Sequence, residues 1–153
     1  MKHIEYAYSR GMDSEELDDR LRSAETGVLA LADGGDAYAV PLAHYYDGNG
    51  LYFRIGITDD SKKQAFWDNT QTACYVLYGA EPTANPQGLD SWSIIVTGEL
   101  VELPEAERER FDTAEINRHF SPIRVFDEEI EEIKITISEF EIDTITGRVT
   151  PKQ

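Results

Sequence analysis

The sequence has little cysteine and no long apolar run, and each shortage excludes a class of protein. Cys74 is the only cysteine in 153 residues, so neither an internal disulfide nor a cysteine metal cluster can form. We expect a buried structural thiol there. No stretch approaches the roughly 18 apolar residues of a membrane-spanning helix, and the first residues lack the apolar segment of a signal peptide. The sequence therefore predicts a cytoplasmic protein that does not span or bind a membrane.

Positive charge is also scarce, because 14 basic side chains face 30 acidic ones and leave a formal net charge of −16. Nucleic acids and anionic membranes bind cationic surfaces, so neither is an expected partner. Lysine is rarer than arginine, and acids occur in almost every segment. This composition is typical of proteins kept soluble in high salt, where ions screen the repulsion between carboxylates. We predict a halophilic protein, and an ordinary acidic protein is the alternative.

Common catalytic and metal-binding motifs are missing. The sequence contains no G-x-S-x-G, Walker loop or G-x-G-x-x-G, and His3, His44 and His119 have no suggestive neighbours. The acids of 127–132 lack the alternating pattern of a calcium loop and favour a solvated helix face. We therefore predict no metal site, identify no catalytic residue, and interpret His44 as structural, with the substrate side of a site as the alternative.

The apolar pattern predicts one domain, residues 1–153, made mainly of β-strands with flanking helices. Helices are expected over 14–24, 62–69, 104–120 and 125–133, and strands over 27–32, 37–46, 51–58, 72–79, 91–103 and 134–149, with a long loop over 80–90. Asp13 or Ser14 is a candidate helix cap. Pro41 lacks a backbone donor and indicates a sheet edge or bulge, and Gly98 indicates a bend or bulge. Strands joined by hairpins in this number favour a small antiparallel barrel.

One stretch, residues 50–66, departs from the acidic composition of the chain. Arg54, Lys62 and Lys63 occur there, with the hydroxyls of Thr58 and Ser61 nearby. A phosphate in so acidic a protein can be held only where local cations and backbone donors override the surrounding field. Two interpretations stay open at this point: a phosphate site, and surface ion pairs between these bases and Asp59, Asp60 or Asp68.

The segment GVLALADGGDAYAVPLAHYYDGNGLYFRIGITDDSKKQAFWDNTQTACYV, residues 27–76, resembles the FMN-binding split barrel of the pyridoxamine 5′-phosphate oxidase-like family. The resemblance extends over about residues 11–103. It implies a homodimer with an FMN site at each side of the subunit interface. It also implies that Arg54 and the Ser61, Lys62 and Lys63 segment hold the flavin phosphate. The stretch from Ile55 to Thr58 would run along the cofactor.

The same resemblance makes Pro41 a backbone wall of the flavin site and brings Trp92 to the flavin from the next strand or from the partner subunit. For Trp92, packing in the core or interface is the alternative. The implied function is an oxidoreductase that passes electrons from a reduced nicotinamide to a small-molecule acceptor.

Vitamin B6 oxidation itself is not expected, because the chain ends ITGRVTPKQ and offers only Arg148 where the oxidase has an Arg-x-x-x-x-Leu-x-Pro-like region. Three alternatives remain: a deazaflavin-dependent reductase, a flavin- or heme-binding sensor or storage module without turnover, and an empty barrel that acts as an interaction protein.

Overall fold

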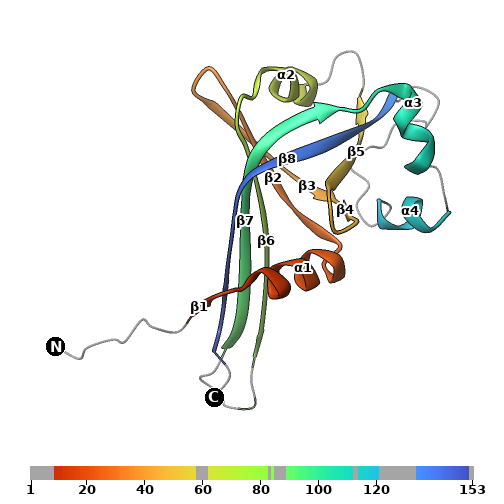
Figure 1. The fold of residues 1–153 in the computed structure, drawn as a ribbon. Helices are drawn as coiled ribbons and strands as arrows, with labels where there is room; N and C mark the ends of the chain where they lie inside the picture. Colours follow the sequence, from red (N-terminus) through yellow and green to blue (C-terminus); the bar gives the residue numbers. More distant parts are fainter. Residues whose placement is uncertain are drawn as a thin grey trace.

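The computed structural model describes residues 9–57, 62–82, 84, 89–111, 114–120 and 134–151, and its fold is a β-barrel with short helices around it (Figure 1). The strands are β1 (Arg10–Gly11), β2 (Thr26–Asp33), β3 (Asp36–Ala43), β4 (Tyr45–Tyr46), β5 (Leu51–Ile57), β6 (Ala73–Pro82), β7 (Leu89–Glu102) and β8 (Lys134–Val149). The helices are α1 (Ser14–Ser23), α2 (Lys62–Asn69), α3 (Glu105–Arg108), the 3-10 turn Glu109–Phe111 and α4 (Ala114–His119).

All described strand pairs are antiparallel, and they form one sheet in the order β3-β2-β6-β7-β8-β5-β4, with β1 paired to β8. The two ends of the sheet approach each other, because β3 comes into contact with β5. No hydrogen-bonded pairing joins these two strands among the described residues. The fold is therefore an antiparallel split β-barrel, as the sequence predicted.

The interior of the barrel follows from the two-residue period of the strands. On β5, Leu51, Phe53 and Ile55 are buried, and the same alternation buries Tyr75 and Leu77 on β6. The other strands contribute buried residues in the same way: Leu29, Leu31, Val40, Leu42, Ile94, Val96 and Phe140. We call the side of the sheet that carries these residues its inner face.

Strands β6, β7 and β8 continue past the barrel as a three-stranded ribbon, and α1 lies against it (Figure 1). At the barrel end of these strands, the pairing of β7 with β8 shifts register between Thr97 and Gly98. This confirms the predicted bulge. Helix α1 begins at the predicted cap: the Asp13 carboxylate accepts from the Glu16 backbone N–H, and the Glu16 side chain accepts from the Asp13 backbone N–H.

Three sequence-based expectations were wrong. The loop expected over 80–90 is shorter, because β6 and β7 stay paired out to Pro82 and Leu89. The single helix expected over 104–120 is broken into α3, a 3-10 turn and α4. Phe111 and Phe120 are nine residues apart and would lie on opposite sides of one straight helix, yet both are buried in the same cluster, so one straight helix cannot carry both. Cys74 is only half-buried.

The helix expected over 125–133 lies outside the described residues.

Candidate functional site

The basic stretch is built around β5, whose two faces separate apolar from polar side chains. Leu51, Phe53 and Ile55 point into the barrel and are at most 1% exposed. Tyr52 and Arg54 take the opposite, outer face of the same strand. The two-residue alternation of this strand therefore directs Arg54 away from the core.

An aromatic cluster covers this part of the outer face and fixes the surroundings of Arg54. The Arg54 guanidinium carbon lies 5.3 Å from the centroid of the Phe120 ring, which α4 supplies from its end. Arg110 stacks in the same way on Tyr52 and Phe111, at 5.4 Å and 4.7 Å. Cation–π contacts hold an arginine side chain against aromatic rings. The cluster therefore limits the conformations open to Arg54.

Lys62 and Lys63 are the first residues of α2, which follows β5 in the chain. The helix is attached to the barrel at Phe66, which is buried and stacks on Tyr38 at 5.3 Å. A second attachment is Thr70, whose hydroxyl accepts from the Ala32 backbone N–H at 3.1 Å. The structure thus fixes the backbone of the two lysines at the start of a helix, the end that favours anions. Thr58 and Ser61, and the candidate ion-pair partners Asp59 and Asp60, lie outside the described residues.

Pro41 lies on β3, which is the edge strand of the sheet, and this confirms the prediction from its missing N–H. Its side chain belongs to a row of cross-strand neighbours on the outer face. The row runs across five strands through Pro41, Val28, Val76, Ile95 and Thr146. A second row beside it contains Ala39, Ala30, Cys74, Thr97 and Thr144.

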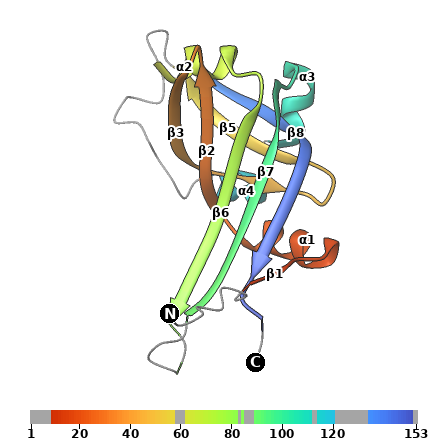
Figure 2. The same ribbon diagram turned by 90° about the vertical axis from the view of Figure 1, so that its left-hand side faces the viewer.

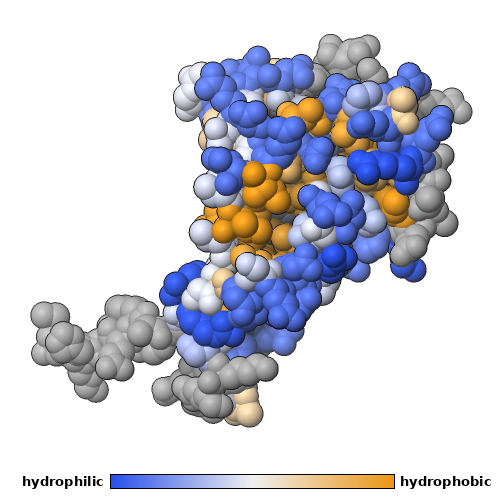
Figure 3. All heavy atoms as spheres, viewed as in Figure 1, coloured by the Kyte–Doolittle hydropathy of each residue, from blue (hydrophilic) through white to orange (hydrophobic). Residues whose placement is uncertain are grey.

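These ten side chains, which we call the uncharged face, carry no charge in a chain with a net charge of −16. Figure 2 looks onto this side of the sheet, where β3, β2, β6, β7 and β8 lie side by side and the described helices lie at its ends or behind it. Ile95 is 45% exposed there. Apolar side chains also reach the surface in the view of Figure 3, in the area between α1 and α2.

Among the described residues, the structure does not bring Trp92 together with Arg54 or Pro41 within one chain. It shares the inner face with the buried Ile94 and Val96, whereas Pro41 belongs to the outer face. The partners of Arg54 and Trp92 on β8 are Ile137 and Val149. Twelve residues of strand, up to about 40 Å, separate these two positions.

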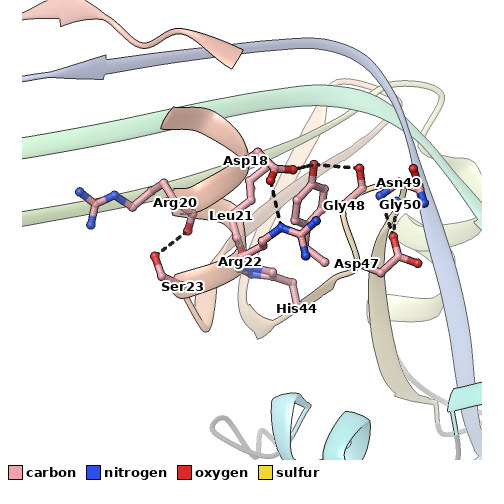
Figure 4. Close-up of polar contacts among 11 residues, drawn as sticks. Asp18, Arg20, Leu21, Arg22, Ser23, His44, Asp47, Gly48, Asn49 and Gly50 are labelled. Carbon is pink, nitrogen blue, oxygen red and sulfur yellow. Dashed lines mark hydrogen bonds and ion pairs between the residues drawn. The ribbon is translucent and has the colours of Figure 1, made fainter. Parts of the chain in front are cut away.

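His44 is buried between α1, β3 and β6, and both ring nitrogens have a hydrogen-bond partner. Figure 4 shows His44 beside Leu21 of α1. Its Nε2 donates to the Leu21 carbonyl at 3.0 Å, and its Nδ1 accepts from the Tyr75 hydroxyl at 2.7 Å. The Leu21 carbonyl can only accept, which fixes this tautomer for the neutral ring. The structure therefore supports the structural interpretation of His44. Sequence reasoning missed its partners, and burial raises the pKa of the Tyr75 phenol.

We expect His44 to make the protein less stable as the pH falls below about 6.5. Burial lowers the pKa of its imidazole below the ordinary value of 6.5. Below pH 6.5 His44 therefore binds a proton in the unfolded chain but not in the folded chain. Its contribution to the free energy of unfolding is fully present above pH 6.5 and falls by up to about 1.4 kcal/mol per pH unit below it. Urea unfolding between pH 8 and about pH 5 measures this slope. The His44→Gln variant, which cannot titrate, should lose the slope; an equal slope in the variant would contradict the assignment.

No cluster of His, Cys, Asp and Glu among the described residues is arranged to hold a metal ion. Within the same residues, no helix is both long and apolar enough to cross a bilayer.

Comparison with known proteins gives a family and a fold. The family model for pyridoxamine 5′-phosphate oxidase matches residues 13–149. No curated protein shows a significant match to this sequence.

Several solved structures share the fold at low sequence identity. An FAD-binding protein from Mesorhizobium loti is 21% identical with a TM-score of 0.70, and the match covers 94% of this chain and 99% of that one. An FAD-binding protein from Mycobacterium smegmatis is 17% identical with a TM-score of 0.63, over 92% and 98% of the two chains. An FAD- and heme-binding protein from the same organism is 16% identical with a TM-score of 0.66, over 95% and 74%.

Proposed function

Because the chain belongs to the pyridoxamine 5′-phosphate oxidase family, we propose that it is an FMN-dependent oxidoreductase that works as a homodimer. The observation that carries the proposal is the position of the cations. In a chain with a net charge of −16, Arg54 lies on the outer face of β5, and Lys62 and Lys63 begin α2, the next helix in the chain. Such a local reversal of charge suits a phosphate monoester.

The chemistry of these residues fits FMN. Arg54 offers the planar fork that binds two phosphate oxygens, and it is held by the Phe120 ring rather than buried in the core. Lys62 and Lys63 are the first residues of α2, and the N-terminal end of a helix favours an anion. Pro41 lies on the edge strand and has no backbone N–H donor. The flat flavin ring would pack against the backbone at this position.

When bound, FMN would supply the hydride chemistry of the reaction. The residues of this chain would anchor its phosphate and leave one side of the ring open to the electron donor and the acceptor. Ile55 would support the strand that runs along the cofactor, because its side chain is locked in the core at 1% exposure. We propose a reduced nicotinamide as the donor and a small electrophile, such as a quinone or nitro compound, as the acceptor.

We propose the uncharged face as the interface of the homodimer. Two copies of so acidic a chain repel each other wherever carboxylates meet, so an interface between them needs a surface free of charge. The uncharged face spans five strands and includes Ile95 and Pro41. A two-fold axis through it would also bury the half-exposed thiol of Cys74. In this arrangement Trp92 would approach the flavin from the partner subunit.

Two alternatives keep the same anchoring residues. A deazaflavin also carries a phosphate, on a longer tail than that of FMN. Arg54 and the α2 lysines would bind that phosphate in the same way. A sensor or storage module that binds flavin or heme without turnover is the second alternative. It is favoured by the similarity to the FAD- and heme-binding protein. Bleaching of bound flavin by NADH or NADPH favours the oxidoreductase, and a spectrum that neither nicotinamide changes favours the storage module.

Replacing Arg54 by Met should weaken FMN binding by about 10- to 100-fold, because a charge-assisted hydrogen bond to phosphate contributes about 1.5–3 kcal/mol. Titration of FMN with protein, followed by quenching of flavin fluorescence, measures the affinity. Arg110→Met is the matched control, because Arg110 stacks on the same aromatic cluster through Tyr52 and Phe111. Its affinity should equal that of the wild type. Equal affinities of the Arg54 variant and the wild type would show that the phosphate binds elsewhere.

A further inference from the structure

The inner face of the β6–β7–β8 ribbon continues beyond the part that α1 covers. Under α1, the Gly147 position is closed off, because a Cβ there would lie 2.6 Å from Leu17 and 2.7 Å from Met12. Further along the ribbon, Trp92 lies between Gly79 and Val149 in the register of the three strands. The indole and the valine thus form an apolar floor next to the helix.

A cavity of about 420 Å³ opens over this floor. The indole of Trp92 lies directly against the Gly79 backbone, since a Cβ added at Gly79 would be 2.4 Å from its Nε1. Val149 and Arg20 line the cavity beside Trp92. The volume is within the range of small-molecule sites, which usually combine apolar walls with a few polar or charged groups.

Arg20 differs from the other arginines at this end of the molecule. Arg10 is paired with Glu16 at 2.7 Å and Arg22 with Asp18 at 2.9 Å. The Arg20 side chain makes no ion pair or hydrogen bond with any residue in the part of the chain that the structure describes. Its guanidinium carbon instead lies 4.5 Å from the centroid of the Trp92 ring. Figure 4 shows the Arg20 side chain directed away from the polar network that Asp18 and Arg22 form beside the turn from Asp47 to Gly50.

We propose that this cavity binds a small aromatic monocarboxylate. The carboxylate would accept from the N–H groups of Arg20, which the stacking on Trp92 holds in one orientation. The aromatic ring would lie on the floor formed by Trp92 and Val149. The exposed carboxylates of Glu81 and Asp90 also line the cavity. They disfavour a dianion, so a carboxylate fits the site better than a phosphate.

Benzoate is the probe, and the indole N–H resonance of Trp92 in ¹⁵N-labelled protein reports its binding. Trp67 on α2 serves as an internal reference that should not shift. For a ligand of this size we expect a Kd on the order of 1 mM. Benzyl alcohol, which keeps the ring and lacks the charge, should bind about tenfold more weakly. Phenyl phosphate should also bind more weakly than benzoate.

The Arg20→Met variant should raise the Kd for benzoate about tenfold, whereas Arg22→Met on the same helix should leave it unchanged. Gly79→Ala, which pushes the indole from its position, should weaken binding without altering any charge. The proposal would be overturned by a Trp92 resonance that does not move at about twenty times the expected Kd. Equal affinities of the two arginine variants, or tighter binding of phenyl phosphate, would also overturn it.

Discussion

Replacing Ile95 by Asp is expected to convert the proposed dimer into monomers. Ile95 is 45% exposed and lies inside the uncharged face, with Val76 and Thr146 beside it. In a two-fold interface the substitution places two carboxylates in a face whose ten side chains carry no charge. An unpaired charge in such a setting costs several kcal/mol, so the dissociation constant should rise by about 1000-fold or more. Sedimentation velocity over a range of protein concentrations measures the change.

Val101→Asp is the matched control for this experiment. Val101 lies on the same strand, is 38% exposed and pairs with Glu139 outside the uncharged face. A carboxylate there joins an already acidic surface, with Glu99 and Glu102 close by in the strand. We expect this variant to remain a dimer. A wild type that is monomeric at micromolar concentration, or an Ile95→Asp variant that stays dimeric, would contradict the proposed interface.

Gly98→Ala is expected to destabilise the fold by about 3 kcal/mol or more. A Cβ at this position would lie 2.1 Å from the Glu141 carbonyl oxygen and 2.9 Å from the Phe140 ring. The oxygen belongs to the backbone of β8, so it cannot move unless the pairing of β7 with β8 opens. Gly98 also lies at the bulge, where the pairing of β7 with β8 shifts register. Urea unfolding of the variant and the wild type measures the difference.

Gly11→Ala is the matched control, because it makes the same substitution at a position where the added Cβ meets no close atom. The nearest atom to a Cβ at Gly11 is a guanidinium nitrogen of Arg148 at 4.0 Å, an ordinary contact. The free energy of unfolding should change by no more than about 0.5 kcal/mol. If both glycine variants had the same stability, the tight packing at the bulge would be disproved.

The fold was predictable because its determinants are local. The Asp13 cap, the Asp33 to Asp36 hairpin turn with its glycines at positive φ, and the alternation along β5 are each visible in a few consecutive residues. Pro41 and Gly98 also carried readable signals, because a missing donor and a missing side chain restrict where each residue can lie in a sheet.

What the sequence could not predict depends on residues that are distant along the chain. The bond between His44 and Tyr75 joins positions 31 residues apart. The uncharged face becomes visible only once the register of five strands is known. For Trp92 a signal was present, because Trp92, Ile94 and Val96 alternate and so share the inner face. Adaptation to high salt and cytoplasmic location stay predictions.

The most direct test of the account is whether the purified protein retains FMN. After incubation with excess FMN and gel filtration, the protein fraction should show the flavin absorption near about 450 nm, at one FMN per chain, in the dimer peak. Arg54 and the α2 lysines would then be the groups that hold it. A colourless protein peak, with all the flavin eluting separately, would contradict the assignment of a flavin site to this split barrel.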